Sequence, residues 1–118
     1  MKNIYVYDKR KYFVIYLKRK FSKNYNVKGL DDVKLMVKKK FMDDDIGIFV
    51  ANNVNDVVAF FRFRDCFDAK IILCTDNIKF SEKYRNTFKI PCLDISRPKK
   101  QFYEDLKDNI DFLFVSES

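Results

Sequence analysis

Short apolar runs alternate with longer amphipathic stretches along this chain. The run from Asp45 to Asn53 is apolar at consecutive positions and is closed by two asparagines. Because a strand of this kind is covered on both faces, the pattern predicts the central strand of a parallel sheet. Further strands are predicted at Ile4 to Tyr7, Asn24 to Lys28, Ile71 to Cys74 and Cys92 to Ile95.

The stretches between these strands carry apolar residues at helical spacing. The predicted stripes are Phe13, Tyr16, Leu17 and Phe21 in a helix from Lys9 to Phe21; Val33, Met36, Val37 and Phe41 in a helix that begins at Asp31 or Asp32; Val57, Val58 and Phe61 in a helix capped by Asn53 or Asn55; and Phe102, Leu106, Ile110 and Leu113 in a helix that begins at Pro98. A short helix is expected over Glu82 to Phe88. The alternation predicts one α/β domain over residues 1–118, with a five-stranded parallel sheet in order 2-1-3-4-5 and the first and last helices on the same face.

The composition is that of a packed globular protein, with 47% hydrophobic and 17% aromatic residues. Cys66, Cys74 and Cys92 are odd in number and widely spaced, which favours reduced core thiols over a disulfide framework. There is no signal sequence and no apolar run of membrane length, so we expect a cytoplasmic location without membrane contact. With no histidine and no clear nucleophile and base pair, we expect no enzymatic activity.

The net charge of +7 is concentrated in the amino-terminal third. Residues 1–40 hold 13 Lys and Arg against 3 Asp and Glu, whereas residues 41–118 hold 11 against 14. Two interpretations stay open: solvated helix faces in a chain of biased composition, or a patch for an acidic partner. The candidate partner patch comprises Lys34, Lys38, Lys39 and Lys40. The basic first helix should lie beside the acidic last helix, and pairing between them would weaken the field that a nucleic acid feels.

The aromatic and glycine residues argue against two kinds of nucleotide site. Gly29 and Gly47 are the only glycines, so no glycine-rich phosphate-binding loop is present. Several phenylalanines follow the predicted central strand, on a helix and at its exit rather than across a sheet face. We interpret them as core residues and not as a platform for stacking bases. They are Phe60, Phe61, Phe63 and Phe67.

Residues at the ends of three predicted strands resemble the conserved positions of response-regulator receiver domains, and the likeness extends over essentially the whole chain. Tyr7 and Asp8 stand where receivers have an acidic pair, Thr75 closes the fourth strand, and Arg97-Pro98 stands where the family has Lys-Pro. The resemblance implies a three-layer αβα, flavodoxin-like fold. In this family the acidic pair holds Mg²⁺, an aspartate after the third strand accepts phosphate, and the Thr and Lys contact the phosphoryl group.

The chain departs from the receiver pattern where the phosphoryl chemistry would take place. The phosphoacceptor should fall at Val50, or at Ala51 or Asn52 if the register slips, and none of these is a carboxylate. Of the acidic pair only Asp8 is present, because Tyr7 replaces the other member. A hard divalent cation would lack most of its anionic oxygen ligands, so we expect no metal beyond weak binding at Asp8 and no other cofactor.

The positions after the fourth and fifth strands also differ from the family. Arg97 keeps the positive charge of the receiver lysine but not its shape, and we expect it to pair with Asp8 or Asp76. Asp94 occupies the place where receivers often carry the switch aromatic. The resemblance implies a cis peptide bond before Pro98, a geometry that proline permits at low cost.

These observations predict a stand-alone, degenerate receiver domain that binds another protein in bacterial signalling or regulation, without aspartyl phosphorylation. The partner is not identified by the sequence, and a second copy of the chain stays open. One alternative is an atypical receiver switched by a small ligand or anion held by Thr75, Arg97 and the Asn52-Asn53 loop. Another is a basic module that binds nucleic acid through Lys9 to Lys20 and Lys38 to Lys40. We expect such binding to be weak and sensitive to salt.

Overall fold

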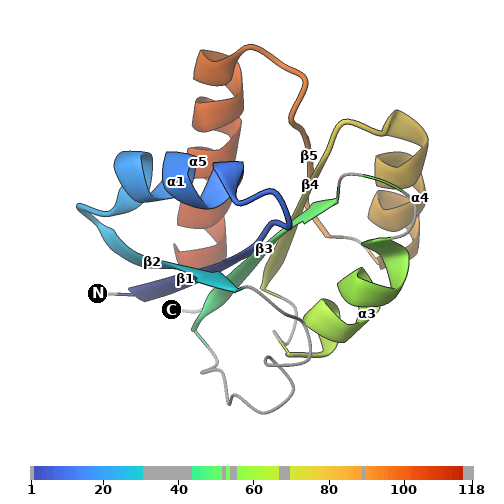
Figure 1. Ribbon diagram of the computed structural model, residues 1–118, viewed down its shortest axis with the longest axis horizontal. Helices are drawn as coiled ribbons and strands as arrows, with labels where there is room; N and C mark the ends of the chain where they lie inside the picture. The colour runs from blue at the N-terminus through green and yellow to red at the C-terminus, as the bar shows by residue number, and fades with distance from the viewer. Residues whose placement is uncertain are drawn as a thin grey trace.

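A sheet lies between two layers of helices in the computed structural model, which describes residues 2–30, 44–51, 53, 56–66, 70–88 and 90–115 (Figure 1). The strands are β1 (Lys2–Tyr7), β2 (Tyr25–Leu30), β3 (Ile46–Ala51), β4 (Ile71–Thr75) and β5 (Cys92–Asp94). The helices are α1 (Tyr12–Phe21), α3 (Val57–Cys66), α4 (Ile78–Phe88) and α5 (Lys99–Val115). Outside the described residues lie the helix predicted from Asp31 or Asp32, the partner patch of Lys34, Lys38, Lys39 and Lys40, and the residues Asn52, Asn55 and Phe67.

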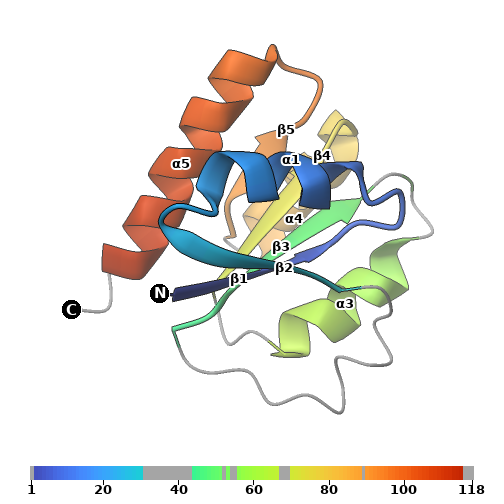
Figure 2. The ribbon, with the colours of Figure 1, turned by 60° about the vertical axis from the view of Figure 1, so that its left-hand side comes forward.

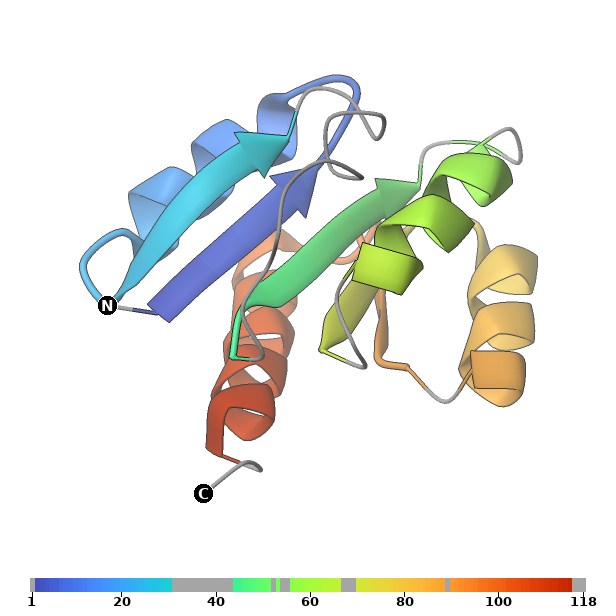
Figure 3. The same cartoon turned by 90° about the horizontal axis from the view of Figure 1, so that it is seen from below.

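The sheet has the predicted topology. Its strands run in the order β2-β1-β3-β4-β5, and every neighbouring pair is parallel. Figure 3 shows the arrows of β2, β1 and β3 pointing the same way. The register places Ala51 beside Thr75, and Thr75 beside Asp94. Since all strands point the same way, their carboxyl ends meet at one edge, which is where parallel α/β sheets generally hold a site.

One face of the sheet is covered by α1 and α5 (Figure 2), as the sequence predicted. The apolar stripe of α5 is buried at Phe102, Leu106, Ile110 and Leu113. It packs against the side chains that β1, β3 and β4 direct to this face: Ile4, Val6, Ile46, Ile48, Val50, Ile72 and Cys74. Removing each large apolar side chain from water contributes about 1.5 to 3 kcal/mol, so this contact is a main source of stability.

The opposite face of the sheet packs against α3 through stacked aromatic rings. Tyr7 and Phe49 stack with their ring centroids 4.9 Å apart, and Phe60 and Phe63 meet Phe49 edge-on at 5.4 and 5.3 Å. Phe60 and Phe63 are fully buried, which confirms their assignment to the core. The predicted apolar stripe of α3 is wrong at two positions, because Val58 is 64% exposed and Phe61 is 38% exposed. The helix turns its phenylalanines at positions 60 and 63 inward because these can reach Phe49.

Two helices begin at other residues than predicted. α1 begins at Tyr12 rather than Lys9, because residues 8–11 form a tight turn in which the Lys11 N–H donates to the Asp8 carbonyl at 3.0 Å. Lys11 lies in the left-handed region at φ 61°, which a helical residue cannot adopt. α4 starts one turn earlier than predicted, at Ile78. The ends of the strands differ from their predicted bounds by at most two residues.

The two cysteines with described side chains confirm the prediction of reduced core thiols. Cys74 and Cys92 are free and buried, on the neighbouring strands β4 and β5. Burial raises the pKa of both thiols above its ordinary value, because the buried site penalises the thiolate. These thiols are therefore packing residues of low reactivity.

Gly29, on the edge strand β2, allows α1 to approach the sheet closely. A Cβ atom placed at this glycine would lie 3.1 Å from Cγ1 of Val14 and 3.3 Å from its Cγ2. The absence of a side chain at this position thus sets how near α1 lies to β2.

Opposite charges on α1 and α5 are not paired, contrary to the prediction. Among the described residues, no ion pair joins the two helices, although they cover the same face. Lys20 instead places its Nζ over the ring of Tyr103 at 5.6 Å, and Asp111 accepts a hydrogen bond from the Tyr25 hydroxyl at 2.9 Å. The aromatic rings between the helices separate their charges, so the basic surface of α1 is not neutralised by α5.

The helices show no sign of a membrane span. α5 has 17 residues and carries charged side chains along its length. Within the described part of the chain, no helix combines the length and the apolar character that crossing a bilayer requires.

We predict that truncating Leu106 lowers the free energy of unfolding by about 2 to 5 kcal/mol, because Leu106→Ala leaves a cavity in the layer between α5 and the sheet. The matched control is Phe112→Ala on the same helix, where the ring is 68% exposed and the loss should stay below about 0.5 kcal/mol. Urea unfolding followed by circular dichroism measures both. Equal losses in the two variants would contradict this packing of α5.

Candidate functional site

The candidate site lies at the edge where the carboxyl ends of β1, β3, β4 and β5 meet. The residues that the sequence analysis selected lie at the ends of these strands or close after them. The described members of the predicted pocket are Tyr7, Asp8, Val50, Ala51, Thr75 and Arg97. The structure brings the ends of β1, β3 and β4 together, but it turns Arg97 away from them, as described below.

Val50 and Ala51 end β3 without a reactive group. Each is 1% exposed. Val50 belongs to the core between the sheet and α1 and α5, whereas Ala51 faces the aromatic core under α3. Ala51 is the register partner of Thr75, so it stands opposite the hydroxyl that ends β4. The last two residues of this strand therefore offer buried hydrocarbon where a receiver would offer a carboxylate.

Asp8 stabilises the start of α1. Its side chain is buried, and its two carboxylate oxygens accept hydrogen bonds from the backbone N–H groups of Arg10 at 3.1 Å and Phe13 at 2.9 Å. The first N–H groups of a helix have no partner within the helix, and a negative charge suits this end of the dipole. Asp8 thus does the work of a helix cap, and both its oxygens are already engaged.

The described residues contain no cluster of acidic, cysteine or histidine side chains that could hold a metal ion. Tyr7, which replaces the second acidic residue of the receiver pair, is buried against Phe49 in the aromatic core. Its ring fills space under α3 instead of contributing a charged ligand.

Asp56 is a buried carboxylate at this edge that the sequence analysis did not identify. It lies directly before α3, is 1% exposed, and accepts a hydrogen bond from the Asn53 N–H at 3.2 Å. Lys9 reaches it from the β1 loop with 3.2 Å between Nζ and Oδ1. The hydrogen bond and the charge of Asp56 raise the pKa of Lys9 above its ordinary value. The bond from the Asn53 N–H to a carboxylate three residues later has the form of one half of a capping box. Asn55, the other predicted cap of α3, lies outside the described residues.

Thr75 and Asp94 are used to shape the loops after their strands. The Thr75 Oγ1 accepts a hydrogen bond from the Asn77 N–H at 3.2 Å, at the entry to α4. The Asp94 Oδ1 accepts bonds from the Ser96 hydroxyl at 2.6 Å and from the Ser96 N–H at 2.9 Å. The Ser96 bonds hold the pKa of Asp94 below its ordinary value, since they favour the ionised form.

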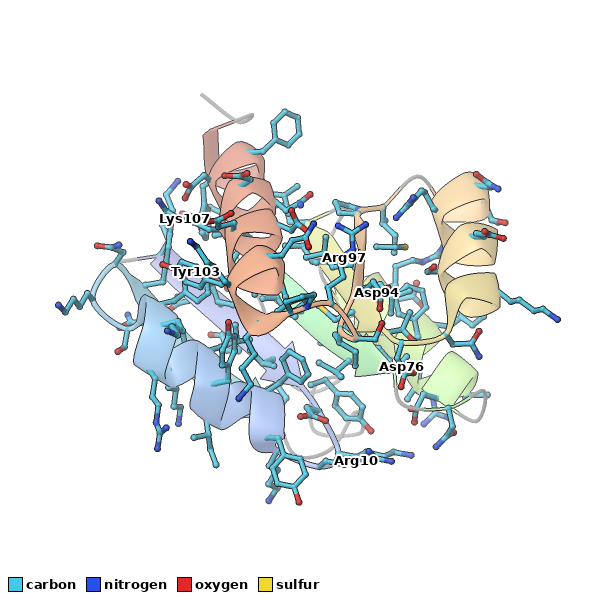
Figure 4. The ribbon with its side chains drawn as sticks, turned by 90° about the horizontal axis from the view of Figure 1, so that it is seen from above. Arg10, Asp76, Asp94, Arg97, Tyr103 and Lys107 are labelled. Atoms are coloured by element: carbon cyan, nitrogen blue, oxygen red, sulfur yellow. The ribbon has the colours of Figure 1, made fainter. Side chains whose placement is uncertain are left out.

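Arg97 corrects two predictions. It pairs with Asp105, with 3.3 Å between Nη1 and Oδ2, and not with Asp8 or Asp76. The carboxylate of Asp8 is occupied by α1, and in Figure 4 Arg97 and Asp76 lie on either side of Asp94. The peptide bond before Pro98 is trans, as are all others in the described residues, and the Pro98 carbonyl accepts the first helical bond of α5 from Phe102 at 3.0 Å.

These contacts define what the edge can do chemically. Its carboxylates cap α1, bind Lys9 or close a turn, and its central strand ends in two apolar residues. The hydrogen bonds and the ion pair at this edge hold loops and helix starts in place. In receiver domains, the same edge of the sheet is where phosphoryl transfer takes place. The sequence signal that could have revealed Asp56 is its place after the Asn-rich loop, directly before an apolar helix.

Solved structures with a similar fold include two bacterial proteins. The crystal structure of an adenylate cyclase from Rhodopirellula baltica matches with a TM-score of 0.71 and 12% identity, over 98% of this chain and 92% of that chain. The receiver domain of a Francisella response regulator matches with a TM-score of 0.67 and 13% identity, over 100% of both chains. In sequence, the chain matches no protein-family model and no curated protein. The structural likeness shows that this chain has a receiver-like fold, which agrees with the resemblance found at Asp8, Thr75 and Arg97.

We predict that Asp8→Ala lowers the free energy of unfolding by about 0.5 to 2 kcal/mol, because the variant leaves the first N–H groups of α1 without their carboxylate. The control is Asp76→Ala, an exposed aspartate at the same edge, which should change stability by less than about 0.5 kcal/mol.

Thermal unfolding with and without excess Mg²⁺ extends this test to metal binding. The midpoint of the unmodified chain should not change with Mg²⁺, because both oxygens of Asp8 already accept bonds. A Mg²⁺-dependent rise that disappears in Asp8→Ala would show that this carboxylate holds a cation.

Proposed function

We propose that this chain is a degenerate receiver domain that acts by binding another protein, without aspartyl phosphorylation. The observation that carries the proposal is the end of β3, where buried Val50 and Ala51 stand on a receiver-like fold beside Thr75. A phosphoryl group cannot be linked to either side chain, since neither has an oxygen.

The contacts of the other pocket residues support a role without phosphoryl transfer. Asp8 is engaged by the backbone of α1, and Arg97 by Asp105 on α5. The chain also has no histidine to act as a general base. We therefore propose a regulatory rather than an enzymatic role in bacterial signalling.

An exposed surface on α1 supports binding to another protein. Tyr12 and Ile15 are 73% and 54% exposed and lie one helical turn apart. The exposed cations Lys18 and Arg19 follow them on the same helix. Apolar side chains beside unneutralised positive charge fit a partner with an acidic, partly apolar surface, and a second copy of this chain is the alternative partner.

We predict that phosphodonors leave the chain unmodified. Incubation with acetyl phosphate and Mg²⁺ should leave the intact mass unchanged, and beryllofluoride should leave the amide spectrum unchanged, because β3 ends without a carboxylate. A receiver domain that takes up phosphate under the same conditions serves as the positive control. Stoichiometric, acid-labile phosphate on Asp8, Asp45 or Asp56 would refute the proposal.

A ligand-switched receiver is less well supported by the contacts. In that alternative, Thr75, Arg97 and the Asn52-Asn53 loop would hold a small anion together. Arg97 binds Asp105 instead, and the Thr75 oxygen accepts the Asn77 N–H. Arg97 would have to turn from Asp105 toward the end of β4 before the two groups could share an anion.

Nucleic-acid binding is a second candidate function, favoured by the unpaired cations of α1. Lys18, Arg19, Lys20 and Lys23 are exposed and have no ion-pair partner among the described residues. Their charges are not offset by α5, so a phosphate backbone would feel them. A surface of this size neutralises about four phosphates, which supports weak, sequence-independent binding.

We predict that binding to labelled DNA weakens between about 50 and 150 mM salt by about 50-fold for duplex and about 20-fold for single strands, the dependences expected for about four phosphate contacts. Fluorescence anisotropy measures it. The triple variant Lys18→Gln, Arg19→Gln, Lys20→Gln should abolish binding, whereas Lys107→Gln on α5 should not alter it. Tight binding that persists at the higher salt would promote nucleic acid over a protein as the partner.

A further inference from the structure

A groove of about 300 Å³ lies between the first turns of α1 and α5, next to the loop that follows β5. Its lining residues come from α1, from the loop after β5 and from the start of α5: Tyr12, Phe13, Tyr16, Ile95, Arg97, Lys99 and Phe102. Phe13 meets Phe102 edge-on, with ring centroids 5.4 Å apart, and Tyr16 lies 6.3 Å from the same ring. The interior is therefore aromatic, and its volume is at the lower end of the range for small-molecule sites, about 300 to 1,000 Å³.

The positive charges of the groove all come from the segment that begins α5. Lys99 is exposed and has no ion-pair partner among the described residues. One guanidinium nitrogen of Arg97 pairs with the Asp105 carboxylate, and the side chains of both residues are partly exposed. None of the described residues that line the groove is acidic. An apolar interior beside two cations is complementary to a molecule with an apolar body and a single negative charge.

One polar group of the groove lacks a hydrogen bond. The hydroxyl of Tyr16 is shut off from solvent and has no partner in the described part of the chain. Buried hydroxyl groups are normally satisfied, and Tyr16 is one of the residues that line the groove. An acceptor atom of a bound molecule that reached this hydroxyl would supply the missing hydrogen bond.

We propose that this groove binds a small amphipathic carboxylate, an aromatic or branched aliphatic acid. The apolar body lies against Phe13, Ile95 and Phe102, and the carboxylate lies toward Lys99 and Arg97. A molecule of one ring and a short acidic arm matches the volume. This site stands on the groove alone and is independent of the proposed loss of phosphoryl chemistry.

The test compares three probes that share one ring and differ in charge: phenylacetate, phenylacetamide and phenethylamine. Titration with phenylacetate, followed by NMR, should shift the backbone amide signals of Tyr16, Ile95 and Lys99. The anion should bind about tenfold more tightly than the neutral amide, as expected for one charge-assisted contact, and the amine should bind more weakly than the amide.

Matched variants assign the two parts of the site. Lys99→Gln should remove the preference for phenylacetate over phenylacetamide, whereas Lys107→Gln, on a later turn of α5 (Figure 4), should keep it. Tyr12→Ala should weaken the binding of both phenylacetate and phenylacetamide, because it removes a side chain that lines the groove. Ile15→Ala, which removes an exposed apolar side chain of α1 outside the groove, should weaken neither.

Three results would overturn the proposal. Equal affinity for the acid and the amide would show that the cations do not select the ligand. Shifts confined to residues outside the groove would place the binding elsewhere. Absence of any shift with phenylacetate up to about 10 mM would show that the groove takes no ligand of this class. Because none of these measurements involves a phosphodonor, their failure is separate from a failure of the proposed function.

Discussion

The structure depends on the burial of β3 and β4 between two layers of helices. Their side chains alternate between the core under α1 and α5, to which β3 contributes aliphatic residues, and the core under α3, to which it contributes Phe49. A shift of one residue in the register would exchange these two sets, and Phe49 would then face α5 while Val50 faced α3. The different shapes of the two cores therefore fix the register, and the register fixes which residues reach the carboxyl edge of the sheet.

That edge shows how a site can keep its architecture while its polar groups take on structural work. Asp8 and Asp94 accept hydrogen bonds from backbone N–H groups of the segment that follows, and Asp56 accepts one from the loop that precedes it, so each holds a segment in place. Lys9 balances the most deeply buried of these carboxylates. Such bonds stabilise the fold whether or not the protein is a catalyst, because backbone N–H groups at the ends of helices and in tight turns need hydrogen-bond partners. Polar residues at this edge are consequently not, by themselves, a sign of activity.

The sequence was sufficient to predict the sheet but not the contacts at its edge. Strand order and helix faces follow from apolar runs such as 71–74 and from stripes such as that of α5, which local spacing determines. The inward turn of α3 toward Phe60 and Phe63 depended on the ring of Phe49, a contact between distant segments. The partner of Arg97 was wrong for a similar reason, since a long side chain selects among several acids by geometry that periodicity does not encode.

Gly29 links the edge of the sheet to the groove on the other side of α1. The helix lies near β2 because this glycine presents no side chain to Val14. The same helix supplies Tyr12, Phe13 and Tyr16 to the groove, whose opposite wall belongs to α5 and the loop before it. A bulkier residue at position 29 would push α1 away from β2. Because α1 forms one side of the groove, the width of the groove would change although its own residues stayed the same. The width of the groove is in this sense set by a strand that it does not touch.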